Sequence, residues 1–414
     1  MNFTVSGKKI KRYLFVLLVL SLNFGEYIKV FGIALSQCLA LVLLVFSVSD
    51  IIKSYYVYKE LQVEDKLILF LTVFWVVISF VQVFWVEDFS SWKSGIRSLY
   101  VNLFICLEMC VLFREDHDYT LVMRSVNISL YFSILAGLYE IFKGEPFDNI
   151  SETVFLKDEV RTFFGNPNDC ATWIILCLLG STLYCAKCKK SKFFGFVGWG
   201  LGMYVIYHTG SRAGRLSVFM AGISVFVGYL IYIERKIKEG TRSRIKALHI
   251  LSIMGIGGTA VLWILCNDLV SVIGNISNAP TSDVFRLKII KESIEVAMEY
   301  MLMGAGAGQT TFNIGINPHN FLLELLSDYG VVVAVVVIYI IWKIFMRIFE
   351  SYKITFYEIV CFSFVPTFLL ISIASSSMAR LRMVWVVLLL YYFVTMENED
   401  SACNMQKNKS ILLG

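Results

Sequence analysis

One histidine in the C-terminal half of the sequence stands where it could take up a proton. The stretch NPHNFLLELLSDYG places His319 directly ahead of a long apolar run. We expect Asn317 to cap a helix with Pro318 at its first position, so that His319 and Asn320 lie in the first turn. The positive end of a helix lowers the pKa of a nearby imidazole, and neutral imidazole can act as a general base. Glu324, one turn further on, either orients this site or balances its charge. The alternative for His319 is a side chain that only hydrogen-bonds a loop.

A second polar cluster carries two arginines at the start of an expected helix. The stretch YHTGSRAGRL sets Arg212 and Arg215 three residues apart, and therefore on one helical face. Ser211 is placed to cap this helix, whose first backbone N–H groups attract anions. Gly214 keeps the backbone open to close approach. The pattern predicts an anion site, because the planar guanidinium group suits phosphate.

Further arginines are expected on the same side of the membrane as these two. Arg286 falls at the start of an amphipathic helix predicted over residues 283–303, in which apolar residues recur at helical spacing. Arg286 is either a phosphate ligand or a solvated charge among neighbouring lysines and a glutamate. Arg161 and Arg382 are secondary candidates for substrate binding. Each of these arginines could instead reach lipid phosphates, as interfacial arginines often do.

The glycine-rich stretch GAGAGQ (residues 304–309) has another role. It is superficially similar to a nucleotide-binding loop, but no strand precedes it and we expect it to lie outside the cell. We therefore predict that its glycines allow the chain to return tightly over the membrane. Residues 319–345 would form a helix longer than the bilayer core, so we expect its first turns either to stand above the core or to pivot near Gly330.

These residues must be positioned by membrane-spanning helices. The 414 residues are 57% hydrophobic and 15% aromatic, with a mean hydropathy of +0.69. A water-soluble protein of this composition would expose large apolar patches, and a β-barrel would show short alternating strands. We predict an all-α polytopic membrane protein that forms one transmembrane domain over residues 1–414. Most of the ten cysteines lie in apolar runs, which indicates buried free thiols.

The apolar runs predict about twelve spans of roughly 20 residues. They are 13–31, 33–52, 67–86, 96–113, 122–142, 170–186, 193–209, 213–233, 247–266, 321–345, 355–374 and 383–396. With the N-terminus inside, the inner segments hold about 24 of the 37 basic residues, in agreement with the positive-inside rule. Both termini are then cytoplasmic, and the long loop 267–320, with its amphipathic helix and the histidine motif, faces outward.

The ordered motifs carry a family resemblance. The SRAG start at Ser211, the Arg286 helix, the glycine turn and the pair His319-Asn320 followed by Leu323-Glu324 occur in that order. The sequence thereby resembles the O-antigen ligase and O-antigen or capsule polymerase family of bacterial envelope enzymes. RTFFGNPNDCAT (161–172) is similar to the family's outer loop, and the resemblance covers residues 160–345. Ala213 follows Arg212 where the family often has glycine.

The resemblance implies a GT-C-like glycosyltransferase of the bacterial inner membrane. Its donor and acceptor would be undecaprenyl-pyrophosphate-linked glycans, and membrane lipid, flippase and chain-length regulator proteins would be partners. Arg212 and Arg286 would bind the pyrophosphate, and His319 would take the proton of the acceptor hydroxyl, as catalytic residues. Arg215, Arg161, Asn320, Glu324 and Arg382 would bind substrate. We expect no cofactor, no metal and no nucleic acid.

Three alternatives stay open. A ligase would hand the glycan to a terminal carrier; we favour a polymerase because capsule and wall-polymer polymerases are more similar around the GNPN stretch. A metal-dependent mechanism would use the acidic pairs Glu87-Asp88 and Asp158-Glu159. A polysaccharide or lipid flippase should carry charges in the middle of its spans, where this sequence has mainly Glu108 and Glu140.

Overall fold

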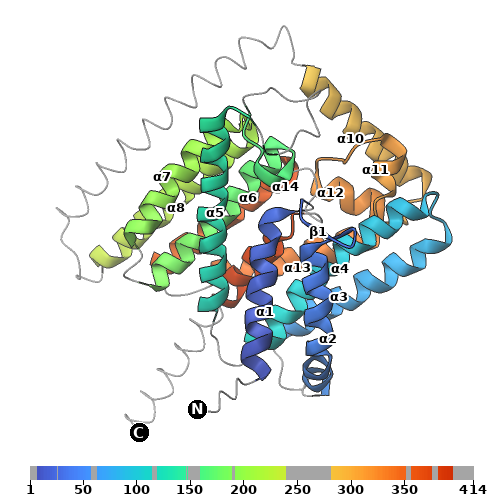
Figure 1. The fold of residues 1–414 in the computed structure, drawn as a ribbon, viewed down its shortest axis with the longest axis horizontal. Helices are drawn as coiled ribbons and strands as arrows, with labels where there is room; N and C mark the ends of the chain where they lie inside the picture. Colours follow the sequence, from blue (N-terminus) through green and yellow to red (C-terminus); the bar gives the residue numbers. More distant parts are fainter. Residues whose placement is uncertain are drawn as a thin grey trace.

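The computed structural model describes the chain as a set of packed helices (Figure 1). The described residues are 7–25, 27–56, 63–113, 119–145, 147, 159–188, 192–238, 281–350, 356–374 and 381–394. Among them, the strands β1 (Lys29–Val30) and β2 (Ile33–Ala34) form one short antiparallel hairpin. The described part therefore agrees with the all-α prediction, with this hairpin as a small addition.

The described helices run along the whole chain. In chain order they are α1 (Gly7–Ser21), α2 (Leu35–Tyr56), α3 (Val63–Val81), α4 (Phe89–Phe113), α5 (Thr120–Lys143), α6 (Pro167–Lys187), α7 (Lys192–His208), α8 (Arg212–Lys238), α10 (Thr281–Glu299), α11 (Gln309–Ile314), α12 (Phe321–Glu324), α13 (Gly330–Glu350) and α14 (Phe356–Ala374). A helix at Met383–Val394 follows. The short 3-10 helices η1 (Leu22–Phe24), η3 (Gln82–Phe84) and η4 (Thr162–Phe164) end or connect longer ones, and a π-helix, η7 (Leu325–Tyr329), joins α12 to α13.

Five helices in the described residues are long and apolar enough to cross a membrane, judged by length and composition. They are Lys66–Phe84, Phe89–Phe113, Thr120–Lys143, Pro167–Cys185 and Phe321–Met346. Shorter apolar helices at Leu35–Ser49, Ser363–Ser372 and Met383–Val394 lie where spans were also predicted. The predicted span 247–266 lies outside the described residues. The structure fits a multi-pass all-α membrane protein, and the number of twelve spans stays a prediction.

The first predicted span, 13–31, was wrong at its C-terminal end. The helix α1 ends at Ser21, and the 3-10 turn that follows ends at Gly25, whose φ is 52°. The chain then forms the β1–β2 hairpin, in which Lys29 pairs with Ala34. A positive φ suits glycine but ends a helix, so apolar composition alone misplaced this boundary.

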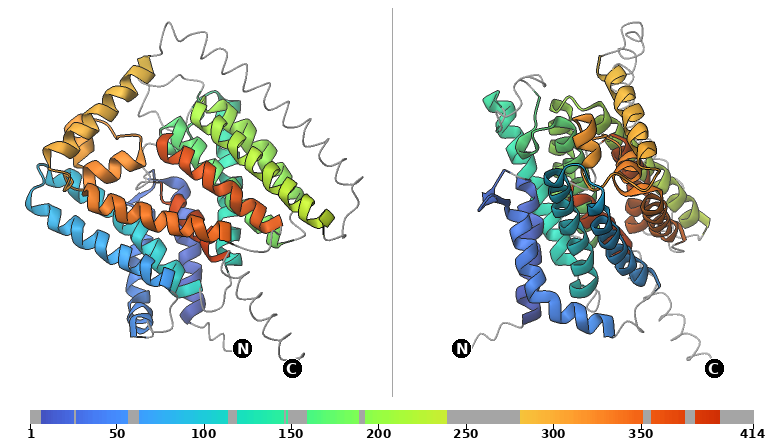
Figure 2. Two further views of the ribbon diagram at one scale, coloured as in Figure 1. Left: turned by 180° about the vertical axis from the view of Figure 1, so that it is seen from behind. Right: turned by 90° about the vertical axis from the view of Figure 1, so that its right-hand side faces the viewer.

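Helix α6 lies at the centre of the bundle. Helices α5, α7 and α8 pack against it, and most of its residues are buried. Figure 2 shows α8 (yellow-green) lying alongside α14 (red), the most extensive pairing of helices in the structure. The apolar faces of these helices thus form one core, which holds the start of α6 and the start of α8 at the same end.

An aromatic cluster supports the helix that follows His319. Trp75 of α3 packs edge-on against Tyr329 of the π-helix, with ring centroids 5.2 Å apart. Trp385 packs against Trp75 at 6.0 Å and against Phe321 at 6.5 Å. Aromatic rings prefer such edge contacts. The contacts join the segment that follows His319, which is α12 and the π-helix, to α3 and to the helix Met383–Val394.

Helix α10 lies crosswise to α3 and α4 at one end of the bundle (Figure 1). Its C-terminal end is tied to the end of α3. The indole of Trp85 donates a hydrogen bond to the carbonyl of Gly304 at 2.9 Å, and the hydroxyl of Tyr300 donates to the carboxylate of Glu87. These bonds place the segment after α10 against the end of a membrane-spanning helix. We call this end of the bundle the site end.

Candidate functional site

The loop that leads into α6 is held by a buried carboxylate. Glu140, in the last turn of α5, is 4% exposed. Its two oxygens accept the backbone N–H groups of Phe147 at 2.8 Å, Arg161 at 2.9 Å and Thr162 at 2.8 Å. A carboxylate that accepts several backbone hydrogen bonds is strongly held. Glu140, one of the two charges noted within predicted spans, therefore anchors a loop at a helix end.

The start of α6 and the start of α8 are joined directly. Asn166 caps α6, since its side chain accepts the N–H of Asn168 at 2.9 Å. The hydroxyl of Ser211 donates to the side-chain oxygen of Asn168 at 2.7 Å and accepts the N–H of Gly214 at 3.0 Å. Ser211 thus caps α8 as expected. A Cβ on Gly214 would lie 2.6 Å from the Cβ of Ala171, so glycine is required for this close packing.

The two arginines of α8 have different surroundings. Arg212 is the first residue of α8 and its side chain is exposed. The guanidinium of Arg215 lies 5.6 Å from the centroid of the Tyr207 ring and 3.4 Å from the carbonyl oxygen of Gly210. Arg215 therefore binds its own turn through a cation–π contact and a long hydrogen bond. Arg212 is the more accessible of the two.

The helix cap near His319 is not the one predicted. The side chain of Asn320 caps α12, accepting the N–H groups of Leu322 at 3.0 Å and Leu323 at 3.2 Å. Asn317 instead accepts the hydroxyl of Thr311 at 2.8 Å. His319 precedes the cap in a left-handed conformation, with φ 51°. The prediction that His319 and Asn320 lie in the first helical turn was wrong, because a residue with this φ cannot continue a helix.

The pKa of His319 is nevertheless lowered from its usual value, the direction expected. Burial is the main cause, since it disfavours the charged imidazolium. The nearby carboxylate of Asp169 opposes this effect, and the positive charge of Arg286 adds to it. The imidazole therefore lies within electrostatic range of both side chains, one from α6 and one from α10. Burial is thus the main cause of the lowered pKa of His319.

Arg286 reaches this site from α10. The helix starts at Thr281, two residues earlier than predicted, so Arg286 lies past its first turn. Its side chain is exposed. The argument from the positive helix end is therefore weaker for Arg286 than for Arg212, but its charge acts on His319. We call Arg212, Arg286, His319 and Asp169 the arginine–histidine site.

The glycine turn between α10 and α11 packs against the π-helix. Gly304, Gly306 and Gly308 all have positive φ values, of 87°, 113° and 76°. The carboxylate of Asp328, which is 3% exposed, accepts the N–H of Gly308 at 2.9 Å and that of Thr310 at 2.9 Å. The carbonyl of Asp328 accepts the N–H of Gly306 at 2.8 Å. The glycines thus serve a tight turn of the backbone, in keeping with the return path predicted.

Gly330 gives the helix above this turn its bend. Its φ is 86° and its ψ is 170°, which is outside the helical region, and it directly follows the π-helix. A Cβ on Gly304 would lie 2.5 Å from the backbone nitrogen of Gly330. The two backbones are in direct contact, so neither position accepts a side chain without movement. The helical backbone is therefore interrupted at Gly330, and a pivot there stays a prediction.

The acidic pair Glu87-Asp88 is used by the fold. The side-chain oxygen of Gln309 accepts the N–H of Glu87 at 3.1 Å and of Asp88 at 2.9 Å, while its amide donates to the carbonyl of Asp88 at 2.7 Å. The Asp88 carboxylate accepts the N–H of Ser91, and its hydrogen bonds with Ser91 lower its pKa. Within the described residues, no three His, Cys, Asp or Glu side chains gather as metal ligands would. Asp158 lies outside the described residues.

The remaining substrate-binding candidates are buried. The side chain of Arg161 is 2% exposed and that of Glu324 is 8% exposed. Arg382 is 5% exposed and donates a hydrogen bond to the hydroxyl of Ser36 at the start of α2. These three side chains are therefore placed to support the fold around the arginine–histidine site rather than to reach solvent.

Sequence reasoning missed the acidic residues that surround this site. Asp169 had a weak signal, because it follows the Asn-Pro start of α6 in the GNPN stretch. Asp328 had none, because its partner Gly308 lies 20 residues earlier and the contact depends on a π-helix. Gln309 was likewise hidden, since its partners Glu87 and Asp88 lie 222 and 221 residues earlier, in the connection before α4.

The fold and the site together define a multi-pass helical membrane protein in which an imidazole with a lowered pKa feels the charges of Arg286 and Asp169. Residues 197–338, which include Arg212, Arg286 and His319, match the family described as O-antigen ligase. The chain thus has the family domain of an O-antigen ligase or polymerase-like protein. No curated protein matches the chain. The domain supports a glycosyltransferase-like activity on lipid-linked glycans in surface glycan synthesis.

Proposed function

We propose that this protein polymerises undecaprenyl-pyrophosphate-linked repeat units of a surface polysaccharide on the outer face of the bacterial inner membrane. The observation that carries the proposal is the position of His319. Its imidazole is half-buried, has a lowered pKa, and lies in electrostatic range of Arg286 and Asp169. A neutral imidazole beside an arginine is what proton removal and departure of an anion require together.

The reaction joins an acceptor hydroxyl to the anomeric carbon of the donor glycan. As the new C–O bond forms, the bond from the anomeric carbon to the pyrophosphate oxygen breaks, and undecaprenyl pyrophosphate leaves with the electron pair. The hydroxyl proton passes to His319. Arg286 and Arg212 bind the pyrophosphate, whose negative charge grows as it leaves. In this scheme Asp169 stabilises the imidazolium that forms.

Metal independence is part of the proposal. It is supported by the bonds that already engage Glu87 with Tyr300, and Asp88 with Ser91. Activity that survives a strong chelator of divalent cations agrees with it. Loss of activity under the chelator that Mg²⁺ restores would assign the metal a catalytic role.

A ligase is the second candidate, because the matched family carries that description. It would use the same donor, base and arginines, and would differ in the acceptor, which would be a terminal carrier. The GNPN stretch, whose Asn166 and Asn168 fix the start of α6, supports the polymerase by resemblance only.

The test compares surface glycan and lipid-linked glycan from cells that lack the gene. Complementation uses the unchanged gene or His319→Ala. A polymerase leaves single repeat units in the deletion strain, and His319→Ala fails to restore the ladder. A ligase leaves full-length chains on the prenyl carrier. Repeat units that accumulate on the inner leaflet would instead indicate transport and overturn the proposal.

His208→Ala is the matched control. His208 is also half-buried, lies at the end of α7, and packs against the rings of Tyr204 and Tyr207 at 4.7 and 5.7 Å. It takes no part in the proposed reaction, so the ladder should return. A ladder lost in both variants at equal protein levels would remove the case for His319 as the base.

A further inference from the structure

Helix α10 presents three distinct faces. One face is buried against the protein and includes Ile289, Ser293 and Val296, spaced as a helical stripe. A second face carries ion pairs in solvent. The third face is apolar and exposed, with Leu287, Ile294 and Met298. We call these three residues, together with the exposed Met301 just after the helix end, the α10 stripe.

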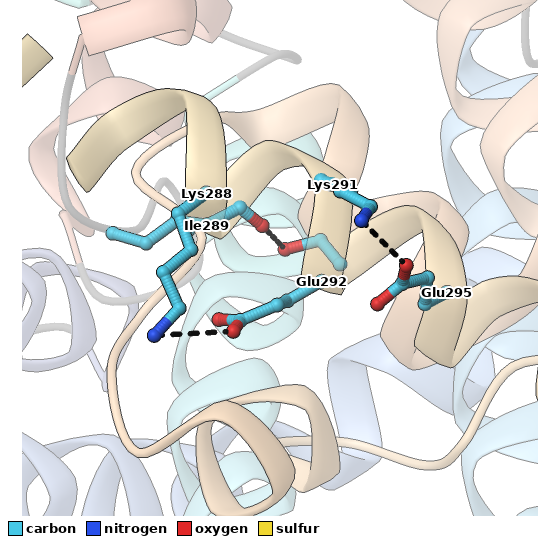
Figure 3. A network of polar contacts seen from close by, with 6 residues as sticks. Lys288, Ile289, Lys291, Glu292 and Glu295 are labelled. Atoms are coloured by element: carbon cyan, nitrogen blue, oxygen red, sulfur yellow. Dashed lines mark hydrogen bonds and ion pairs between the residues drawn. The ribbon is translucent and has the colours of Figure 1, made fainter. Parts of the chain in front are cut away.

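The charged face of α10 carries two ion pairs whose side chains are largely exposed (Figure 3). Lys288 pairs with Glu292 at 3.5 Å, and Lys291 pairs with Glu295 at 3.6 Å. The side chains of Lys291 and Glu295 are 79% and 62% exposed. Ion pairs between residues four apart on an exposed helix face contribute little to stability, and they are typical of a helix face in contact with water.

The α10 stripe is too exposed for a protein surface in water. Leu287 is 68% exposed, Met298 63% and Met301 80%. Leu287, Ile294 and Met298 follow one another at spacings of seven and four residues, so they lie along one line of the helix, and Met301 follows just beyond the helix end at Glu299. A continuous apolar line beside a charged line indicates a helix that contacts two media.

The end of the stripe lies near the exposed apolar side of α3. Met303, just beyond the stripe, is exposed, and its carbonyl accepts a hydrogen bond from Gln82 at the end of α3. Beside Gln82, Phe84 is 86% exposed, and Phe80 is exposed one turn earlier. The apolar side of α3 belongs to a candidate span. The exposed apolar side chains of α3 and those of the α10 stripe therefore approach the same point, the hydrogen bond between Gln82 and Met303.

We propose that α10 is an interfacial helix whose Leu287–Met301 stripe lies in the bilayer surface at the site end, while its Lys–Glu face stays in water. Its crosswise direction relative to α3 in Figure 1 fits a helix in the plane of the interface. The occupant of the stripe is membrane lipid.

One consequence rests on the proposed function. Arg286 directly precedes Leu287, so a stripe fixed in the interface holds the guanidinium of Arg286 at the depth of lipid headgroups. The pyrophosphate of a prenyl-linked glycan lies at that depth, because its tail is in the acyl region and its sugars are in water. The stripe would then set the height at which Arg286 meets the donor.

The test measures nitroxide labels on the full chain in nanodiscs of phosphatidylethanolamine and phosphatidylglycerol. Labels are placed at Met298→Cys and Met301→Cys, with Lys291→Cys and Glu295→Cys as matched controls on the same helix. Two relaxation agents are compared: oxygen, which partitions into lipid, and a water-soluble nickel chelate. The ratio of label collisions with oxygen to label collisions with the chelate should be several-fold higher at the stripe than at the controls. The protein labelled without an added cysteine gives the background.

Two results would overturn the proposal. Equal access of the nickel chelate at all four positions would place the stripe in water. Exclusion of both reagents from the stripe would mean that a protein surface covers it. The labels need no substrate, so this outcome is independent of the glycan assay. The double variant Met298→Asp/Met301→Asp tests the link from the stripe to Arg286 separately. If the labels show lipid contact but this variant leaves the KM for the lipid-linked donor unchanged, that link is wrong while the interfacial position of α10 stands.

Discussion

Asp328 offers the sharpest test of how the site is held. Its carboxylate accepts the N–H groups of Gly308 and Thr310, each at 2.9 Å, in a buried position. Asp328→Ala removes both acceptors. A buried N–H group left without a partner costs about 1–3 kcal/mol, so the loss is about 2–6 kcal/mol. The glycine turn would then open far more often, while the spans stay folded.

Hydrogen exchange measures this opening directly. Since about 1.4 kcal/mol corresponds to a factor of ten, exchange in a peptide covering residues 304–312 should accelerate by about one to four orders of magnitude. Asp328→Asn keeps one acceptor and should give a smaller increase. Activity should fall with the loss of protection, since this turn connects the helix of Arg286 to the loop of His319.

The control is Asp88→Ala, in the same region but outside the turn. It removes the acceptor for the N–H of Ser91, and such caps are worth about 1 kcal/mol. Exchange should rise at the start of α4 and stay unchanged in residues 304–312. Unchanged protection of the glycine turn in Asp328→Ala, at normal protein yield, would refute the reasoning.

Two further predictions concern pH and backbone packing. In the proposed mechanism neutral His319 accepts the proton, so kcat/KM should fall as pH drops through its lowered pKa. Arg286→Gln removes a cause that lowers this pKa and should move the acid limb to higher pH, whereas Asp169→Asn removes a cause that raises it and should move the limb lower. Shifts in the same direction would show that the limb belongs to another group. Gly304→Ala should reduce the folded yield, measured by size exclusion in detergent, because its Cβ would meet backbone atoms 2.5 Å away at φ 87°. Gly222→Ala is the control, because a Cβ there would have no atom within 4 Å, and its yield should match that of the unchanged protein. Equal yields of the two variants would mean that the turn relaxes freely.

Apolar runs bounded by polar residues predicted the helices well. The span expected at 193–209 is α7, Lys192–His208, and the span expected at 122–142 is α5, Thr120–Lys143. Hydropathy decides these helices because each run is continuous and each end carries a charge or a glycine. It failed at residues 22–34, where an equally apolar run contains glycines with positive φ. Local composition does not report which glycine adopts such an angle.

The candidate site was predictable in its parts and only partly in its assembly. Arg286 and His319 were expected to act together, and the structure brings them into electrostatic range. The choice of cap between Asn317 and Asn320 was not predictable, because both precede apolar sequence. A hydrogen bond from Thr311, six residues earlier, occupies Asn317, and Asn320 is the cap. This side-chain contact around the loop, which the sequence pattern does not show, decided the geometry around the histidine.

The hydrogen bonds around the glycine turn also order the protein's biogenesis. Gln82 reaches the carbonyl of Asp328 across 246 residues, and Trp85 reaches Gly304 across 219. A chain inserted from its N-terminus has α3 in place long before Asp328 leaves the ribosome. The turn cannot close until the span beginning at Phe321 is in the membrane. The candidate site therefore stays incomplete during most of the chain's synthesis and is assembled only after this late span has been inserted.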